Sequence, residues 1–421
     1  MKIKTKNLPI EKVNALPYRK HKKPKKQWFL LRKLLKILSI KDLKNTNFSY
    51  TMIDMEKLGK NEPSLILMNH SSFIDLKIAS TIFNDRPFNI VCTSDGFIGK
   101  EWLMYNLGCI PTNKFVTDAT LIKDMIYCFK NLKSSVLMFP EASYSFDGTA
   151  TPLPQIMGRL LKLLKVPLVM IKTYGAFSRD PLYNNLQLRK VNVSCEVKYV
   201  LSPKDIEEKS VTQLDDIVKE LFTFDSFKWQ QENNIIINEH FRADCLNRVL
   251  YKCPHCQKEG SLLGKGITIK CLNCNNEYEL TETGYLKNLT NETIFNHIPD
   301  WFKWERECVK NDILNENYSL ELPVDIGIMK NTKCIYMIGE GTLTHNLEGF
   351  TLTSCDNKLN YKQSSTSSYS LYSDYYWYEI GDVICIGTNK ELYYCFPKNY
   401  GDIVAKTRLA TEEMFKLFSK K

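Results

Sequence analysis

The sequence predicts a chain of three folded parts: an α/β domain with a mixed or parallel sheet covered by helices, a small module held by cysteines, and a β-rich C-terminal domain. Short β-rich runs alternate with helical stretches over the first 250 residues. Two C-x-x-C pairs follow, at 253–256 and 271–274. From about residue 331 strand patterns follow one another without an intervening helix, and an amphipathic helix at 402–418 ends the chain.

Length and charge set the first limits. The chain has 421 residues, of which 43% are hydrophobic and 25% charged, an ordinary globular composition with room for several cores. The net charge of +10 is concentrated at the start: residues 1–45 hold 15 Lys and Arg against Glu11 and Asp42, and the remainder is slightly acidic. We expect a basic arm at 1–45, the α/β domain at 46–250, the cysteine module at 251–285, a connector at 286–330 and the β-rich domain at 331–421.

The basic arm contains an amphipathic helix pattern. On a helical wheel, residues 25–38 place Trp28 and six Leu or Ile on one half and most of the Lys and Arg on the other. Such helices lie in the headgroup region of anionic membranes, although this one could instead pack on the α/β domain. A basic arm can also bind nucleic acid, but the apolar face favours a membrane, and we expect no nucleic-acid partner. No apolar run approaches 18 residues and no secretory signal is visible, so we expect a cytoplasmic protein, peripheral on the inner face of the membrane.

The α/β domain is predicted from strands that alternate with helices. The strands are expected at 64–69, 88–93, 135–139, 167–172 and 191–199, and helices at 117–133 and 156–165. Residues 203–250 are also helical in pattern, with 211–221 strongly amphipathic.

His70 and Asp75 stand five positions apart, directly after the first of these strands. In a continuous helix the two side chains would point about 140° apart. If the strand ends before His70 and the helix starts at Ser72, Asp75 lies in the first helical turn, where its side chain leans back toward His70. Alternatively, Ser72 and Asp75 form an S-x-x-D variant of the capping box, with a purely structural role.

Four sequence blocks then occur in a fixed order. They are His70–Asp75, Gly108-Cys109-Ile110-Pro111-Thr112-Asn113-Lys114, Phe139-Pro140-Glu141-Ala142-Ser143-Tyr144-Ser145 and Val166-Pro167-Leu168-Val169. From about residue 50 to 235 the chain thereby resembles the glycerolipid acyltransferases of the 1-acylglycerol-3-phosphate acyltransferase type. That family carries H-x-x-x-x-D, G-x-I-x-x-x-R, F-P-E-G-T-R-S and V-P blocks in this order.

The resemblance implies an acyltransferase of phospholipid synthesis. The donor would be acyl-CoA or an acyl carrier protein thioester, and the acceptor a lysophospholipid, with 1-acylglycerol-3-phosphate first. His70 would be the base and Asp75 would fix its tautomer. We expect no catalytic metal. The alternatives are an acyltransferase for another lysolipid or amphipathic alcohol, or a non-catalytic adaptor that binds lipid.

Two departures from the family pattern affect the acceptor site. Tyr144 stands where the family has an arginine, and Lys114 replaces the arginine of the second block, which keeps the charge but not the bidentate fork. In the family these cations hold the acceptor's phosphate. The resemblance implies that Lys114, Glu141, Ser143 and Ser145 shape the acceptor site. Lys114 could instead be a solvated loop lysine, and Glu141 a local cap.

The cysteine module has metal-ligand spacing. Cys253 and Cys256 are followed, after fourteen residues, by Cys271 and Cys274. Two such knuckles suit four thiolates around a structural Zn²⁺ in a zinc ribbon, with no open position for water. Without a secretory signal the thiols should be reduced. His255, inside the first knuckle, is expected to be exposed rather than a ligand.

The C-terminal domain is predicted from short strands. They are expected at 334–338, 349–353, 370–378, 383–386 and 392–396. Several antiparallel strands followed by one helix resemble a pleckstrin-homology-like barrel, on pattern alone.

Overall fold

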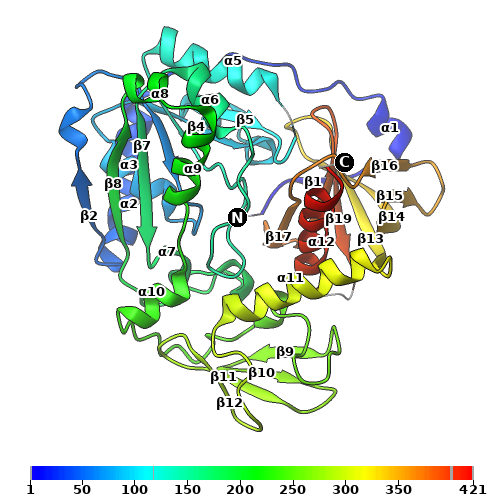
Figure 1. Ribbon diagram of the computed structural model, residues 1–421. Coiled ribbons are helices and arrows are strands. Elements are labelled where there is room, and N and C mark those ends of the chain that lie inside the picture. The colour runs from blue at the N-terminus through cyan, green and yellow to red at the C-terminus, as the bar shows by residue number, and fades with distance from the viewer. Residues whose placement is uncertain (1, 117, 399–401, 420–421) are drawn as a thin grey trace. The chain divides into compact units, whose positions relative to one another are not determined.

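The computed structural model describes residues 2–116, 118–398 and 402–419 (Figure 1). The chain forms two compact units. The α/β unit comprises Lys20–Asp180 and Lys190–Ser226, and the β-rich unit comprises Met1–Arg19, Pro181–Arg189 and Phe227–Lys421. This division differs from the expected one, because the first residues of the basic arm belong to the β-rich unit and only the rest of the arm to the α/β unit.

The α/β unit is built on a seven-stranded sheet, and its mixed topology is the one expected. The strands are β2 (Ser49–Ile53), β3 (Leu65–Met68), β4 (Phe88–Thr93), β5 (Cys109–Thr112), β6 (Ser135–Met138), β7 (Leu168–Tyr174) and β8 (Ser194–Leu201). Their order is β2-β8-β7-β3-β6-β4-β5. Strands β3 to β7 are parallel, and β8 runs antiparallel to β7.

Helices cover both faces of this sheet. They are α2 (Phe29–Asn45), α3 (Asp75–Ile82), α4 (Glu101–Asn106), α5 (Ala119–Tyr127), α6 (Met157–Leu164), α7 (Ala176–Arg179), α8 (Pro203–Glu208) and α9 (Val211–Leu221). The central strand β3 shows why the sequence run is continuously apolar. Ile66 and Met68 pack into the core on one face, and Leu65 and Leu67 into the core on the other.

The parallel strands determine where a site can form. The carboxyl ends of β3, β5, β6 and β7 lie at the same edge of the sheet, because these strands share one direction. The loops that leave this edge carry His70, Lys114, Glu141 and Asp180. In open α/β sheets, ligands bind outside the carboxyl ends of the strands.

Among the described residues, every helix is too short or too polar to span a bilayer.

The β-rich unit contains a large antiparallel sheet of order β16-β15-β14-β13-β19-β18-β17, to which β1 adds in parallel beside β14. The strands are β1 (Thr5–Asn7), β13 (Ser319–Met329), β14 (Ile335–Asn346), β15 (Gly349–Ser354), β16 (Asn360–Ser364), β17 (Tyr372–Trp377), β18 (Gly381–Gly387) and β19 (Leu392–Pro397). The final helix α12 (Ile403–Phe418) lies where the sequence predicts it. A β-rich C-terminal domain is therefore present, while its pleckstrin-homology-like identity stays a prediction.

The cysteine module forms a separate four-stranded sheet in the same unit, of order β12-β11-β10-β9. The strands are β9 (Leu262–Lys265), β10 (Thr268–Cys271), β11 (Glu277–Leu280) and β12 (Leu286–Asn288); the unit's other helices are α1 (Ile10–Asn14), α10 (Ser226–Glu232) and α11 (Ile298–Leu314). Helix α11 lies in the expected connector and packs on the module: Trp301 donates its indole N–H to the carbonyl of Lys252 (3.0 Å), and Glu305 accepts the N–H of Lys252 (2.7 Å).

Candidate active site and metal centre

The side chains of His70 and Asp75 are in contact, as expected for a strand that ends before His70 and a helix whose first turn contains Asp75. The imidazole Nδ1 lies 3.0 Å from Asp75 Oδ2. Helix α3 begins at Asp75 and not at Ser72, so the carboxylate is at the first helical position. The same Oδ2 accepts the backbone N–H groups of Ser71 (3.0 Å) and Ser72 (3.1 Å). Asp75 therefore holds the turn before α3 and contacts the imidazole, whereas the helix itself has Ile74 as its N-cap and no side-chain cap, so the S-x-x-D capping box is not formed.

Asn69 fixes the loop that carries His70. Its side chain is completely buried and its Oδ1 accepts the N–H of Thr173 (2.8 Å), which joins the ends of β3 and β7. Its Nδ2 donates to Ser71 Oγ (2.9 Å). These two bonds hold the residues on both sides of His70, so the imidazole leaves a rigid edge of the sheet.

Burial sets the protonation of the pair. The His70 side chain is 17% exposed and that of Asp75 2%. Burial lowers the pKa of His70 well below its ordinary value, and the nearby charge of Lys114 lowers it further, so the imidazole is neutral at pH 7. Burial raises the pKa of Asp75 to about 8, against the opposing effect of the Ser72 and Ser71 N–H groups. Once Asp75 is ionised it can accept the Nδ1 proton, which leaves the lone pair on Nε2.

Aromatic rings enclose the imidazole. Phe139 stacks on it with ring centroids 4.2 Å apart, and Tyr144 with centroids 3.8 Å apart. Two rings at these distances cannot share one face, so His70 lies between them. Phe73 stacks on Tyr144 at 5.2 Å and is 55% exposed. Tyr144 thus lies directly against the His70 imidazole, at the position where the resemblance implies a phosphate-binding cation.

Glu141 supports the loops rather than pointing to solvent. It is fully buried; its Oε2 accepts the backbone N–H of His70 (2.9 Å) and its Oε1 accepts that of Thr151 (2.9 Å). Burial raises its pKa to about 7. These contacts link the third block to the first and favour the structural role over a direct contact with an acceptor.

Ala142 adopts a left-handed backbone, with φ of +53°, at the position where the family block has glycine. This conformation is strained for a residue with a Cβ atom. We expect Ala142→Gly to raise the free energy of unfolding by about 0.5–1 kcal/mol, since the relief of strain exceeds the added entropy of the unfolded chain. Urea denaturation measures the change. Ala79→Gly, inside α3, is the control and should destabilise by a similar amount; a loss of stability in Ala142→Gly would contradict the strain.

The remaining residues expected at the acceptor site lie near the pair but differ in exposure. Ser143 and Ser145 are buried, and the Ser145 hydroxyl donates to the carbonyl of Thr149 (2.6 Å) and accepts the N–H of Gly148 (2.9 Å). Ser145 therefore shapes its own loop. Lys114 is half-buried after β5, and its charge acts on His70. Substrate contacts by these three residues stay predictions.

Sequence reasoning missed one buried group at this edge. The hydroxyl of Ser72 hydrogen-bonds to Asp180 Oδ1, and Arg179 Nη1 lies 3.0 Å from Asp180 Oδ2. Burial raises the pKa of Asp180 to about 6, against the Arg179 charge. Both residues follow β7 with no recognisable motif. Their position in the sequence could have indicated them. They come shortly after the apolar strand β7, whose carboxyl end lies beside that of β3.

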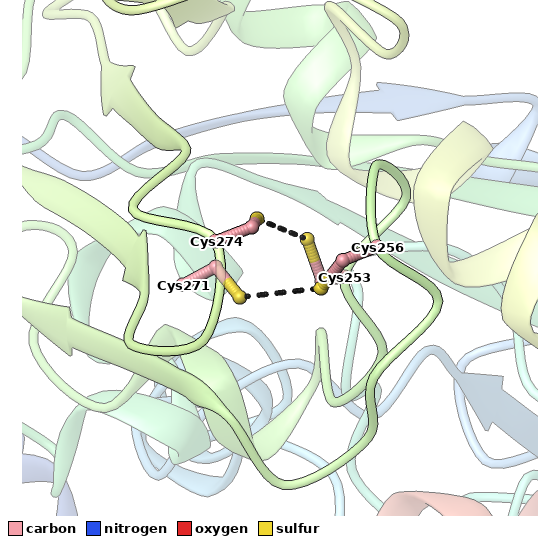
Figure 2. A group of neighbouring side chains, drawn as sticks. All are labelled: Cys253, Cys256, Cys271 and Cys274. Carbon is pink, nitrogen blue, oxygen red and sulfur yellow. Dashed lines mark hydrogen bonds between the residues drawn. The ribbon is translucent and has the colours of Figure 1, made fainter.

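The four cysteines of the module come together as the spacing predicts (Figure 2). Their sulfur atoms all lie within 4.8 Å of one another; Cys253 and Cys274 are 3.7 Å apart, as are Cys256 and Cys271. A tetrahedral ion with metal–sulfur bonds of about 2.3 Å separates its sulfurs by about 3.8 Å, whereas a disulfide requires about 2.05 Å. The group therefore fits a metal ion held by four thiolates.

His255 is not part of this metal-ligand set. Its Nε2 lies 3.1 Å from the hydroxyl of Tyr278 and 3.2 Å from Nδ2 of Asn288. Its ring is thus held by two polar side chains beside the metal group.

Residues 49–171 match the family model described as Acyltransferase. Among solved structures, the chain is similar to the 1-acyl-sn-glycerophosphate (LPA) acyltransferase from Thermotoga maritima, at 15% identity and a TM-score of 0.38, over 45% of this chain and 76% of that one. That likeness is too weak to add to the family match. No curated protein matches the chain. All four sequence blocks lie within this matched segment, which is part of the α/β unit.

Proposed function

We propose that this protein transfers a fatty acyl group from a thioester donor, acyl-CoA or an acyl carrier protein, to the hydroxyl of a lysophospholipid. The observation that carries the proposal is the 3.0 Å contact between His70 and Asp75 at the carboxyl edge of the sheet, within the segment that matches the acyltransferase family. A neutral, partly exposed imidazole backed by a carboxylate is the general base that an alcohol acceptor requires.

In the proposed reaction, Nε2 of His70 takes the proton of the acceptor hydroxyl as its oxygen attacks the thioester carbonyl. Asp75 stabilises the imidazolium that forms. The tetrahedral intermediate then expels the thiolate, which takes the proton from His70, so that one ester and one free thiol result. His70 starts and ends the cycle neutral, which suits a buried ring.

The acceptor expected from the sequence is 1-acylglycerol-3-phosphate, with another lysolipid or amphipathic alcohol as the alternative; the rival function is a non-catalytic lipid adaptor. Incubating the protein with an acyl thioester and each acceptor, followed by mass spectrometry of the lipids, tests the proposal. We expect a diacylated product. An absence of product with every acceptor would support the adaptor instead.

We further propose that α2 binds the anionic inner face of the membrane. One side of α2 packs on the α/β unit, where Ser39 and Leu43 are buried. The rest of the helix surface leaves large apolar side chains in solvent: Phe29, Leu30, Leu34, Ile37, Leu38 and Ile40. Lys33 and Lys41 are exposed on the same helix, so the surface combines apolar and positive groups, as interfacial helices do. Both alternatives for the arm helix are therefore supported.

A double variant tests this surface. Ile37 is 63% and Leu38 64% exposed, so Ile37→Asp with Leu38→Asp leaves the packing of α2 in place. We expect the variant to bind anionic vesicles at least about tenfold more weakly in flotation, because each apolar side chain contributes about 1.5–3 kcal/mol when buried. Leu163→Asp, a 55% exposed position on α6, is the control and should float like the wild type. Equal flotation of the double variant would exclude α2.

For the β-rich unit we propose that the four-cysteine group binds a structural Zn²⁺ and forms a zinc ribbon. The support is the sulfur spacing together with the short antiparallel strands beside it. Cys253, Cys256, Cys271 and Cys274 would be the ligands. The pleckstrin-homology-like assignment of the C-terminal domain stays a proposal on the pattern of strands and final helix.

A further inference from the structure

A second link joins the loops after β3 and β7, in addition to the Asn69–Thr173 contact. Asp180 follows α7 and is 4% exposed. Its Oδ1 accepts the hydroxyl of Ser72, and its Oδ2 lies 3.0 Å from Nη1 of Arg179. Burying a carboxylate costs free energy unless hydrogen bonds and an opposite charge compensate for the lost water, and both are present here. The Asp180 carboxylate is therefore held at a defined place beside the end of β3.

Ser72 connects Asp180 to Asp75. A serine hydroxyl has one proton, and Ser72 donates it to Asp180, so the oxygen can accept the N–H of Ile74 (3.3 Å). The backbone N–H of Ser72 donates to Asp75 Oδ2 (3.1 Å), and the carbonyl of Ser72 accepts the N–H of Asp75 (3.2 Å). The backbone of Ser72 thus holds Asp75, while Asp180 holds the side chain of Ser72.

The Asp75 oxygen in this turn is the one that contacts His70. Oδ2 of Asp75 lies 3.0 Å from Nδ1 of the imidazole. A displacement of the turn would therefore move this oxygen relative to the ring. Catalytic groups must be held in a narrow range of geometries, and a displacement of about 1 Å can lower a rate about 100-fold.

We infer, on the basis of the proposed acyl transfer, that Asp180 is a positioning residue: through the hydroxyl of Ser72 it fixes the turn in which Asp75 contacts His70. Asp180 acts without touching the substrate, because its two oxygens are engaged by Ser72 and Arg179. Loss of the Ser72–Asp180 contact should therefore slow proton transfer and leave substrate binding nearly unchanged.

Two substitutions break this contact in different ways. Ser72→Ala removes the hydroxyl. In Asp180→Asn the amide oxygen faces Arg179, which can only donate, so the amide nitrogen faces Ser72 and the direction of that hydrogen bond reverses. We expect kcat to fall about 10–100-fold in each variant, with KM for donor and acceptor within about twofold of the wild type. The double variant should be no slower than the slower single variant, because both substitutions break the same contact.

The tautomer of His70 gives a second readout that does not depend on turnover. Isotope labelling of the histidine nitrogens distinguishes the two neutral tautomers by NMR, and comparison with His70→Ala assigns the signal. At about pH 9, above the pKa of about 8 of Asp75, wild-type His70 should carry its proton on Nδ1. Each single variant should show a larger share of the Nε2–H tautomer, because Asp75 is no longer held against Nδ1.

A matched control lies in the β-rich unit. Ser370 donates its hydroxyl to the buried carboxylate of Glu412 (2.7 Å), which also lies 2.7 Å from Nη1 of Arg306. Ser370→Ala removes the same kind of hydrogen bond, so it should leave kcat and the His70 tautomer unchanged.

Wild-type kcat and an unchanged tautomer in folded Ser72→Ala would overturn the positioning role and leave the proposed acyl transfer in place. A double variant slowed by the product of the two single effects would also overturn it. If Asp180→Asn does not fold, Ser72→Ala decides alone, since it changes no charge. If the wild type acylates no acceptor, the proposed function fails, and the positioning role fails with it.

Discussion

Asp75→Asn is expected to lower kcat/KM for acyl transfer by about 10³–10⁴-fold while the protein stays folded. The amide oxygen can still accept the N–H groups of Ser71 and Ser72, which keeps the turn before α3. Nδ1 of His70 contacts this same oxygen position, so the amide oxygen can still accept the ring N–H, but it carries no charge. The variant therefore lacks the negative charge that stabilises the imidazolium formed when His70 takes the proton of the acceptor.

Asp118→Asn is the matched control for this variant. Asp118 lies at the start of α5, where its side chain accepts the N–H groups of Thr120 and Leu121, and its hydrogen bonds within the described part of the chain include none to a histidine. Its replacement should change stability by no more than about 1 kcal/mol and leave turnover unchanged. Acyl transfer by Asp75→Asn at more than a tenth of the wild-type rate would show that Asp75 only holds the turn before α3.

The pH dependence follows from the same pair. Burial raises the pKa of Asp75 to about 8, and its proton must leave before Nδ1–H can donate to it. Wild-type kcat/KM should therefore rise with pH to a midpoint near 8, and Asp75→Asn should lose this limb. A pH-rate profile from 6 to 9.5 measures it. A flat wild-type profile would contradict the need for an ionised Asp75.

The stability of the fold should show the opposite trend. Because the pKa of Asp75 is higher in the folded chain than its unfolded value of about 3.9, folding takes up a proton in the window from about pH 4 to 8. The wild type should lose stability relative to Asp75→Asn as the pH rises through this window, which thermal unfolding at several pH values would detect.

Removal of the metal is the second large effect expected. Freshly purified protein should contain about one zinc per chain, and Cys271→Ser should remove it, because three thiolates hold the ion far more weakly than four. The small sheet of β9 to β12 would then lose most of its stability, since a structural zinc contributes more than so small a core can. Metal analysis and amide hydrogen exchange over residues 262–288 measure both effects.

Cys308→Ser is the control for the metal centre. Cys308 lies on α11 outside the four-cysteine group and is half-buried. This variant should keep its zinc and its slow exchange. Wild-type protein with well under one metal ion per chain, or a Cys271→Ser variant with unchanged exchange over β9 to β12, would refute a structural metal.

Much of the fold follows from the sequence because apolar periodicity reports burial directly. The continuous run at β3 and the strongly amphipathic α9 are buried where the patterns require. Strand β13 was missed because Pro323 and charged residues interrupt its apolar pattern; in the sheet its exposed face carries them. Strand β1 was missed because its side chains are all exposed, and its pairing with β14 depends on backbone groups alone.

Those parts of the candidate sites could be predicted in which the functional residues stand at a characteristic spacing in the sequence. The two residues of the His70–Asp75 pair, and the two cysteines of each C-x-x-C knuckle, are only a few positions apart. The conformation of a short stretch of backbone therefore decides whether their side chains meet, and this can be predicted from the sequence. The Ser72–Asp180 contact joins loops more than a hundred residues apart, and only the parallel order of β3 and β7 brings them together. The stacking of Tyr144 on His70 could not be predicted either, because the sequence does not show in which direction the side chain of a loop tyrosine points.

The release of free thiol from an acyl thioester, compared between the wild type and His70→Ala, tests the central claim most directly. With a lysophospholipid present, the wild type should release thiol in step with diacylated product, and His70→Ala should release at least about a thousandfold less. Circular dichroism and thermal unfolding should show both proteins folded. Equal thiol release by the folded His70→Ala variant would contradict the claim that this imidazole is the base.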